Sequence, residues 1–209
     1  MAEFTLFTNP MSRGQIARWA LHEAGADYET VLVEWEAKPQ AFLNANPMGK
    51  VPTLIHHRAG GDKVVTECAA ICLYLADVLP ECGLAPDDDE RADYLRWTFF
   101  AAGPVEQAVT ARSFGFDPQE PRQQGMAGWG SYARTVDALA GHLGHNVFVC
   151  GDRFTMADVY VGSHVDWGVG FKSLPDRPEF TAYLERIRAR PAYQAAKAID
   201  MALIAEMQK

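Results

Sequence analysis

The chain has 209 residues, of which 48% are hydrophobic and 22% charged, an ordinary composition for a globular protein of one large domain or two small ones. The formal net charge of −8 disfavours a general affinity for nucleic acid or for anionic membrane surfaces. No stretch approaches the roughly 20 apolar residues of a membrane span, and the N-terminus lacks a signal-peptide pattern, so we expect a cytoplasmic protein with neither nucleic-acid nor membrane partners.

Strands alternate with helices over the first 80 residues. The apolar run at 4–7 predicts a strand that Asn9-Pro10 ends. Ser12, as the N-cap, and Gly25, as the stop, enclose apolar residues at helical spacing. We expect further strands at 28–33, 51–57 and 63–65, a weak helix or loop at 38–46, and a helix from Thr66 or Glu67 to Pro80. This order predicts an α/β domain at 1–80, with helices packed on a small mixed sheet.

The rest of the chain is predicted to be a linker followed by helices. Residues 81–89 combine Pro, Gly and a run of acids, which favours a linker. Apolar periodicity then predicts an all-α domain at 90–209, with helices at 91–111, 126–143, 157–168, 180–189 and from 192 onward. Thr155 and Asp158 stand three residues apart before one of these helices, and this spacing predicts a capping box.

Cysteines stand at positions 68, 72, 82 and 150. Their spacing indicates neither a disulfide framework nor a zinc site, so we expect free thiols in a reducing compartment and no metal.

The loop between the first strand and the first helix could carry chemistry. Ser12 lies there beside a helix N-terminus, and a hydroxyl in that place can donate to a thiolate and so lower the pKa of the thiol. The alternative is a serine that only caps the helix.

The turn Gly49-Lys50-Val51-Pro52 precedes the third strand. If the Val51-Pro52 bond is cis, the N–H and C=O of Val51 face outward and can pair with a peptide-like ligand. The alternative is an ordinary strand start.

Glu67 and Cys68 open the helix that follows the fourth strand. A helix N-terminus presents free N–H groups and partial positive charge, so it binds carboxylates, and Glu67 could accept from a ligand ammonium. The alternative for Glu67 is an acid that only complements the helix dipole.

In order and spacing, these three segments resemble the thioredoxin-like N-terminal domain of the cytosolic glutathione transferases. The helical remainder, with the capping segment Gly151–Asp158, resembles the second domain of that family. The likeness covers nearly the whole chain and is to bacterial members with a serine in the first loop.

The resemblance implies an enzyme that uses glutathione as a cosubstrate, without a further cofactor. Ser12 would then stabilise the glutathione thiolate, with Asn9 and Arg13 as alternatives. Val51, next to Pro52, would pair with the cysteinyl backbone.

The same resemblance assigns the charged ends of glutathione. Glu67 would take the γ-glutamyl ammonium, Cys68 the γ-glutamyl carboxylate, and Lys50 the glycyl carboxylate. The family usually has Ser where this chain has Cys68, which keeps the backbone N–H but offers only a weak S–H donor, with Arg13 as a partial compensation.

The second substrate would be a small apolar electrophile, and the reaction a detoxifying conjugation in a homodimer. The candidates for lining its site are Met11, Phe99, Phe100, Gly103, Phe114, Phe116, His164 and Trp167. Aromatic residues at helical spacing are also typical of a core, and His164 of a packed histidine.

Two alternatives keep the fold and change the function. One is a non-catalytic binding or interaction module, which the Cys68 substitution suggests. The other is thiol–disulfide chemistry at Cys68, since a thiol at a helix N-terminus is activated.

Overall fold

A computed structural model describes residues 2–208. The chain forms two units: unit 1 comprises Met1–Ala85 with Ala189–Lys209, and unit 2 comprises Pro86–Arg188. Within the described part, no helix is long and apolar enough to cross a membrane.

Unit 1 is built on a four-stranded mixed sheet in the order β2-β1-β3-β4. The strands are β1 (Phe4–Thr8), β2 (Tyr28–Leu32), β3 (Thr53–His56) and β4 (Lys63–Thr66). The first two pair in parallel, whereas β1–β3 and β3–β4 pair antiparallel. All five residues of β1 are buried, as expected for a strand inside a covered sheet.

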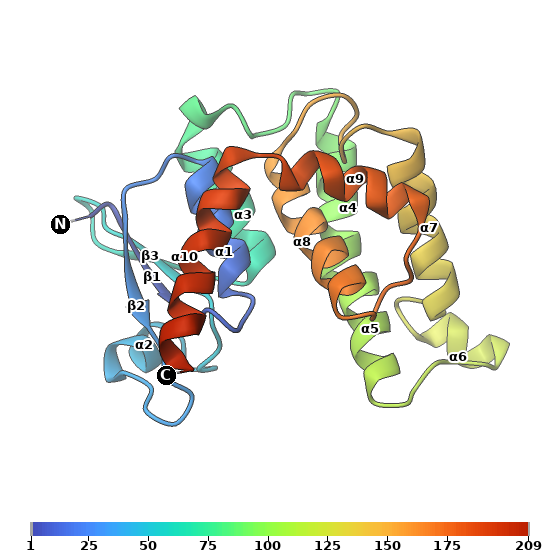
Figure 1. Cartoon of the computed structure of the whole chain (residues 1–209), viewed down its shortest axis with the longest axis horizontal. Coiled ribbons are helices and arrows are strands. Elements are labelled where there is room, and N and C mark those ends of the chain that lie inside the picture. The colour runs from blue at the N-terminus through green and yellow to red at the C-terminus, as the bar shows by residue number, and fades with distance from the viewer. Residues whose placement is uncertain (1, 209) are drawn as a thin grey trace. The chain divides into compact units, whose positions relative to one another are not determined.

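Helices pack on this sheet (Figure 1). They are α1 (Gly14–Glu23), α2 (Gln40–Ala45) and α3 (Cys68–Val78), and α10 (Pro191–Met207) packs on α1. A short 3-10 turn, η1, lies at Pro80–Cys82. The start of α1 lies so close to β1 that a Cβ at Gly14 would stand 1.8 Å from Thr8 Oγ1, so only glycine fits there. The predicted strands and helices of residues 1–80 are confirmed, and the ambiguous segment at 38–46 contains a short helix.

The C-terminal helix α10 belongs to unit 1, whereas the sequence predicts a single domain at 90–209. In Figure 1, α10 (red) lies along α1 (blue). Arg18 on α1 and Asp200 on α10 form an ion pair of 2.9 Å, and their side chains are 2% and 1% exposed. Burial of this pair requires α10 to stay on α1.

Unit 2 is all-helical. Its elements are α4 (Arg91–Phe100), a π-helical stretch η2 (Ala101–Val105), α5 (Glu106–Ser113), α6 (Pro121–Met126), α7 (Tyr132–His145), α8 (Met156–Gly170) and α9 (Pro178–Arg188). The predicted helix at 91–111 is therefore present but interrupted at Pro104, which has no N–H to give the ladder. The predicted helix at 126–143 begins instead at Tyr132, because Gly130 turns the chain with a φ of 68°.

The predicted capping box at the start of α8 is confirmed. Asp158 Oδ2 accepts from the Thr155 N–H at 2.9 Å, and Asp158 Oδ1 accepts from the Val149 N–H at 2.7 Å. The Tyr183 hydroxyl of α9 also donates to Oδ1, at 2.9 Å. One buried carboxylate thus joins the preceding loop, α8 and α9.

Candidate functional site

The three segments singled out by sequence meet at one edge of the sheet of unit 1. Phe7 on β1 pairs with Thr53 on β3, and Thr53 pairs with Thr66 on β4. The end of β1, the start of β3 and the end of β4 are therefore neighbours. The chain leaves this edge into the loop at 9–13, arrives from the turn at 49–52, and continues into the N-terminus of α3.

A direct contact joins two of these segments. The Cys68 thiol, at the first position of α3, donates to the Arg13 carbonyl with an S···O distance of 3.6 Å. The site is thus built from positions 55 residues apart in the chain.

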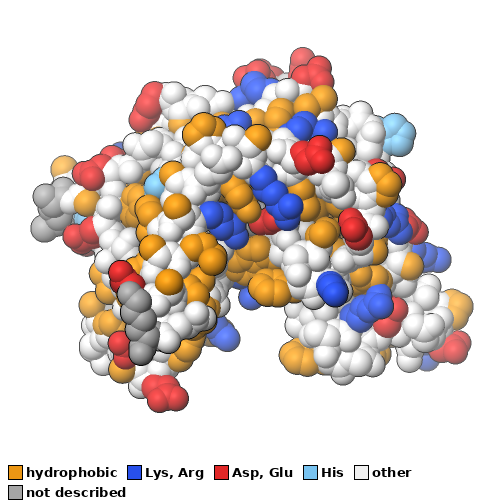
Figure 2. Space-filling view, in the orientation of Figure 1, with side chains coloured by type: hydrophobic (Ala, Val, Ile, Leu, Met, Phe, Trp, Pro, Cys, Tyr) orange, Lys and Arg blue, Asp and Glu red, His pale blue; other side chains and the backbone are white. Residues whose placement is uncertain are grey.

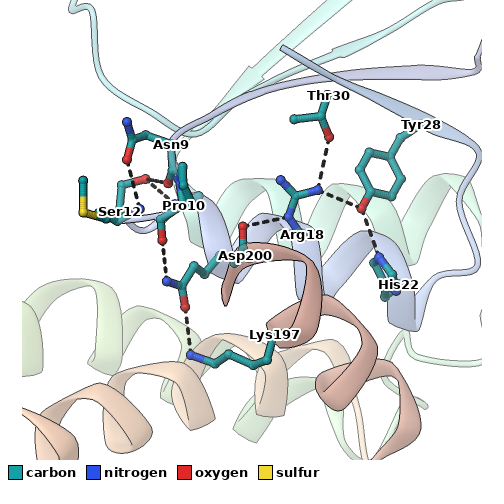
Figure 3. Close-up of polar contacts among 12 residues, drawn as sticks. Asn9, Pro10, Ser12, Arg18, His22, Tyr28, Thr30, Lys197 and Asp200 are labelled. Carbon is teal, nitrogen blue, oxygen red and sulfur yellow. Dashed lines mark hydrogen bonds and ion pairs between the residues drawn. The ribbon is translucent and has the colours of Figure 1, made fainter. Parts of the chain in front are cut away.

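Ser12 lies in the loop after β1, where its hydroxyl has two partners (Figure 3). It donates to the Asn9 carbonyl at 2.6 Å and accepts from the Gly14 N–H at 3.0 Å. The prediction that Ser12 is the N-cap is wrong, since α1 begins at Gly14 and the N-cap position is Arg13. A hydroxyl carries one proton, so Ser12 must turn away from Asn9 to donate to anything else.

Asn9 is buried, at 2% exposed, and both ends of its amide hold the loop. Its Nδ2 donates to the Val33 carbonyl at 3.0 Å, and its Oδ1 accepts from the Met11 N–H at 2.9 Å. These contacts give Asn9 a structural role in shaping the loop around Ser12.

The turn before β3 is held by side chains from the residues that flank α2. Asn46 Nδ2 donates to the Lys50 carbonyl at 2.9 Å, and Lys38 Nζ donates to the Gly49 carbonyl at 3.1 Å. The Val51-Pro52 peptide bond is cis. Over residues 2–208, no hydrogen bond engages the N–H or C=O of Val51. The N–H can therefore donate to, and the C=O can accept from, the backbone of an extended ligand.

Glu67 occupies the N-cap position of α3 in an unusual backbone conformation, with φ 66° and ψ 122°. Positive φ is costly for a residue with a Cβ, and such strain is concentrated at functional sites. Its side chain is exposed. Glu67 therefore presents a free carboxylate next to the N–H groups of the first turn of α3.

Cys68 follows with a side chain that is only 7% exposed. Cys72, one turn later, is fully buried, and burial raises the pKa of its thiol well above the ordinary value. These surroundings disfavour thiol–disulfide chemistry at this helix, because the attacking species is an accessible thiolate.

The residues predicted to line the second-substrate site are divided between the two units. Met11 is exposed on unit 1, at 55%, whereas the others lie on unit 2. Phe99 and Phe114 are 64% and 83% exposed. The remaining predicted aromatic residues contact rings outside the predicted set: Phe100 packs against Trp97, Phe116 against Trp129, His164 against Tyr160 and Trp167 against Phe171. Gly103 lies in η2. In Figure 2, hydrophobic side chains (orange) are scattered over the face shown, among charged and other side chains.

Sequence reasoning did not identify two residues that support this sheet edge. Lys38 holds the Gly49 carbonyl, and Gln15 Nε2 donates to the Pro10 carbonyl at 2.5 Å. Both act on backbone carbonyls, which leave no mark in a sequence. Over the described residues, no group of three or more His, Cys, Asp and Glu side chains could hold a metal ion.

Two family models match the chain. Residues 2–77 match the N-terminal domain of glutathione S-transferase, and residues 106–186 match its C-terminal domain.

Individual glutathione transferases are similar to this chain over most of its length. A glutathione transferase structure from Methylococcus capsulatus is 31% identical, with a TM-score of 0.75 over 95% of this chain and 99% of that one. A sphingomonad glutathione S-transferase complexed with glutathione is 29% identical, with a TM-score of 0.73 over 94% of this chain and 98% of that one. Glutathione S-transferase GstA of Escherichia coli O157:H7 is 26% identical over 91% of this chain and 96% of its own length.

The matches confirm the predicted architecture, a thioredoxin-like α/β domain and an all-α domain. Their extent, together with the 31% identity over nearly full length, leaves one conclusion: the chain belongs to the glutathione S-transferase family.

Proposed function

We propose that this protein is a glutathione transferase, which binds glutathione at the sheet edge of unit 1 and attacks an electrophile with its thiolate. The observation that carries the proposal is the pairing Phe7–Thr53–Thr66, which brings Ser12, Val51 and the start of α3 to one edge. A tripeptide needs a backbone partner, a carboxylate site and a thiol site together, and we assign all three to this edge.

The parts of glutathione suit the groups at this edge. The N–H and C=O of Val51 pair with the cysteinyl residue as one strand pairs with another. The free N–H groups at the start of α3 receive the γ-glutamyl carboxylate, and the exposed Glu67 receives its ammonium. The exposed Lys50 receives the glycyl carboxylate.

Catalysis consists of holding the thiol as thiolate and placing it beside the electrophile. Ser12 supplies the hydrogen bond to sulfur once its hydroxyl turns from the Asn9 carbonyl to the thiolate. A hydrogen bond that favours the charged form lowers the pKa of the bound thiol. We propose a small apolar electrophile as the second substrate, and a cytoplasmic homodimer as the working form.

The test compares the wild type with Ser12→Ala in the conjugation of glutathione to an aromatic halide. A hydrogen bond to a charged group contributes roughly 1.5–3 kcal/mol, so we expect kcat/KM to fall about 10- to 100-fold and the pKa of the bound thiol to rise. Ser113→Ala, on the exposed face of α5, is the matched control and keeps wild-type kinetics. Wild-type kcat/KM in Ser12→Ala would remove Ser12 from catalysis.

One observation favours a second candidate, a module that binds glutathione without conjugating it. The Ser12 proton is already committed to the Asn9 carbonyl at 2.6 Å. Calorimetry separates the two functions: heat on glutathione binding with no turnover of any of a panel of aromatic halides supports the module, and turnover excludes it.

A further inference from the structure

A chain of two hydrogen bonds runs from the C-terminal helix to the loop that carries Ser12. Lys197 Nζ on α10 donates to Gln15 Oε1 at 2.8 Å, and Gln15 Nε2 donates to the Pro10 carbonyl at 2.5 Å. Lys197 and Pro10 mark the two ends of this chain in Figure 3. These bonds connect Pro10 in the loop to Lys197, which is 187 residues later in the sequence.

The polarity of the chain is fixed by the chemistry of its ends. A lysine ammonium has only donors, so Gln15 must turn its amide oxygen to Lys197. The amide nitrogen then faces Pro10, whose carbonyl can only accept. The positive charge of Lys197 polarises the Gln15 amide and strengthens its bond to Pro10.

The position of Lys197 is itself set by three contacts that α10 and its N-cap residue make with α1. Arg190 makes a bidentate ion pair with Glu23, at 2.6 and 2.7 Å. Tyr193 packs edge-on against Trp19, with ring centroids 5.0 Å apart. Asp200 pairs with the buried Arg18.

The spacing of positions 193, 197 and 200 places these three residues on one side of α10, and Arg190 is its N-cap residue. Their partners on α1 hold α10 in one register, so Lys197 reaches Gln15 in a defined position.

The other end of the chain acts at the centre of the proposed thiol site. Pro10 lies between Asn9, whose amide is tied to Val33 and Met11, and Ser12, whose hydroxyl is tied to the Asn9 carbonyl. The Pro10 carbonyl is the loop group that Gln15 holds, and a displaced Pro10 would carry Ser12 with it.

We propose that Lys197 and Gln15 are positioning residues for Ser12, so that the C-terminal helix sets the geometry of the thiol site through the Pro10 carbonyl. The effect on glutathione rests on the proposed function. The effect on the loop does not, because it follows from contacts within the protein.

The test uses Lys197→Met in the full chain, which keeps the length of the side chain and removes its charge and donors. Lys197→Arg restores a cationic donor to Gln15 and is the rescue variant. Lys63→Met, at an exposed position of β4, is the matched control for the loss of one lysine. Gln15→Met removes both hydrogen bonds without altering α10. It tests the positioning role if Lys197→Met does not fold.

Two readouts distinguish positioning from mere stability. We expect amide hydrogen exchange at Met11 and Gly14 to accelerate about tenfold in Lys197→Met, while the amides of β1 keep wild-type rates. In the glutathione complex, we expect a raised pKa of the bound thiol and a kcat about tenfold lower, with KM for glutathione nearly unchanged. Lys197→Arg and Lys63→Met should behave as the wild type in both.

Unchanged exchange at Met11 and Gly14 overturns the proposal, whether or not glutathione binds. A lower melting temperature without a change in exchange or in the pKa of the thiol also overturns it, since the chain would then only stabilise the fold. If the wild type does not bind glutathione, the proposed function fails, and the exchange rates alone decide whether Lys197 positions the loop.

Discussion

Position 68 is the residue at which this chain departs from the usual serine of the family. The Cys68 side chain is buried and donates weakly to the Arg13 carbonyl at 3.6 Å. The backbone N–H at the start of α3 is unaffected by the substitution, so the cysteine removes only a hydroxyl donor from the proposed carboxylate site.

We predict that Cys68→Ser tightens the binding of glutathione. A serine hydroxyl donates to a carboxylate better than a thiol does, and one such hydrogen bond contributes roughly 1 kcal/mol, which lowers Kd about fivefold. Titration calorimetry measures the change. Cys68→Ala retains the backbone N–H and should bind within about twofold of the wild type. Equal affinity of the serine variant and the wild type would show that the side chain at 68 does not reach the ligand.

Residues that begin or end an element could be singled out from the sequence, and residues that support them from a distance could not. Ser12, Val51 and Glu67 stand at a loop, a turn and a helix start, which local patterns mark. Gln15 and Lys38 bind backbone carbonyls of other segments. The hydrogen bond from Ser12 to the Asn9 carbonyl could not be predicted either, because it depends on the conformation of the loop.

At the N-terminus of α8, Asp158 accepts hydrogen bonds from several segments of unit 2. Complete burial raises the pKa of Asp158 from an ordinary 3.8 to about 6. The donors on Thr155, Val149 and Tyr183 oppose that rise, because they favour the charged form. The capping box was visible in the sequence, whereas the contacts from Val149 and Tyr183 depend on the packing of unit 2.

We predict that Asp158 makes the protein less stable as the pH rises from 4 to 7. The folded-state pKa lies above the unfolded one, so the stabilising contribution is complete below pH 4 and is lost as the pH passes 6. A difference of about two pKa units corresponds to roughly 3 kcal/mol in the free energy of unfolding. Urea unfolding across this range measures it.

The variant Asp158→Asn provides the comparison for this profile. Its side chain does not titrate, so its loss of stability relative to the wild type should be larger at pH 4 than at pH 7. Asp88→Asn, at an exposed position, should follow the wild-type profile at every pH. Parallel profiles for the wild type and Asp158→Asn would contradict the raised pKa.

At the level of elements, hydrophobic periodicity predicts the long helices and the four strands of the sheet. It did not find α6, which has six residues and no buried ones, nor the π-helical stretch at Pro104. Short segments bury too little apolar surface to show a period, and the interruption of a ladder depends on how its neighbours pack.

Across the whole chain, unit 1 is assembled from both ends of the sequence. Arg18 and Asp200 are 182 residues apart and form a buried pair at 2.9 Å. Nothing in the sequence of α10, which is rich in alanine, distinguishes a helix that packs on α1 from one that belongs to unit 2. Periodicity alone therefore predicts one domain at 90–209, whereas the segment after Arg188 belongs to unit 1.

We predict strong coupling between Arg18 and Asp200 in a double-mutant cycle. Burial raises the pKa of Asp200, and the neighbouring Arg18 opposes that rise. Arg18→Met leaves that carboxylate without its cation and should cost roughly 3–5 kcal/mol in the free energy of unfolding. Asp200→Leu should cost less, because Arg18 Nη1 still donates to the hydroxyls of Tyr28 and Thr30, each at 3.1 Å.

The double variant Arg18→Met with Asp200→Leu removes both charges and leaves an apolar contact between α1 and α10. It should therefore be more stable than Arg18→Met alone, with a coupling energy of about 2 kcal/mol or more from urea unfolding. The pair Arg177–Asp137 is the control, since its atoms are 2.6 Å apart but its side chains are 34% and 63% exposed. Exposed pairs couple by about 1 kcal/mol or less. Additive losses at Arg18 and Asp200 would mean that burial of this pair does not join the two ends of the chain.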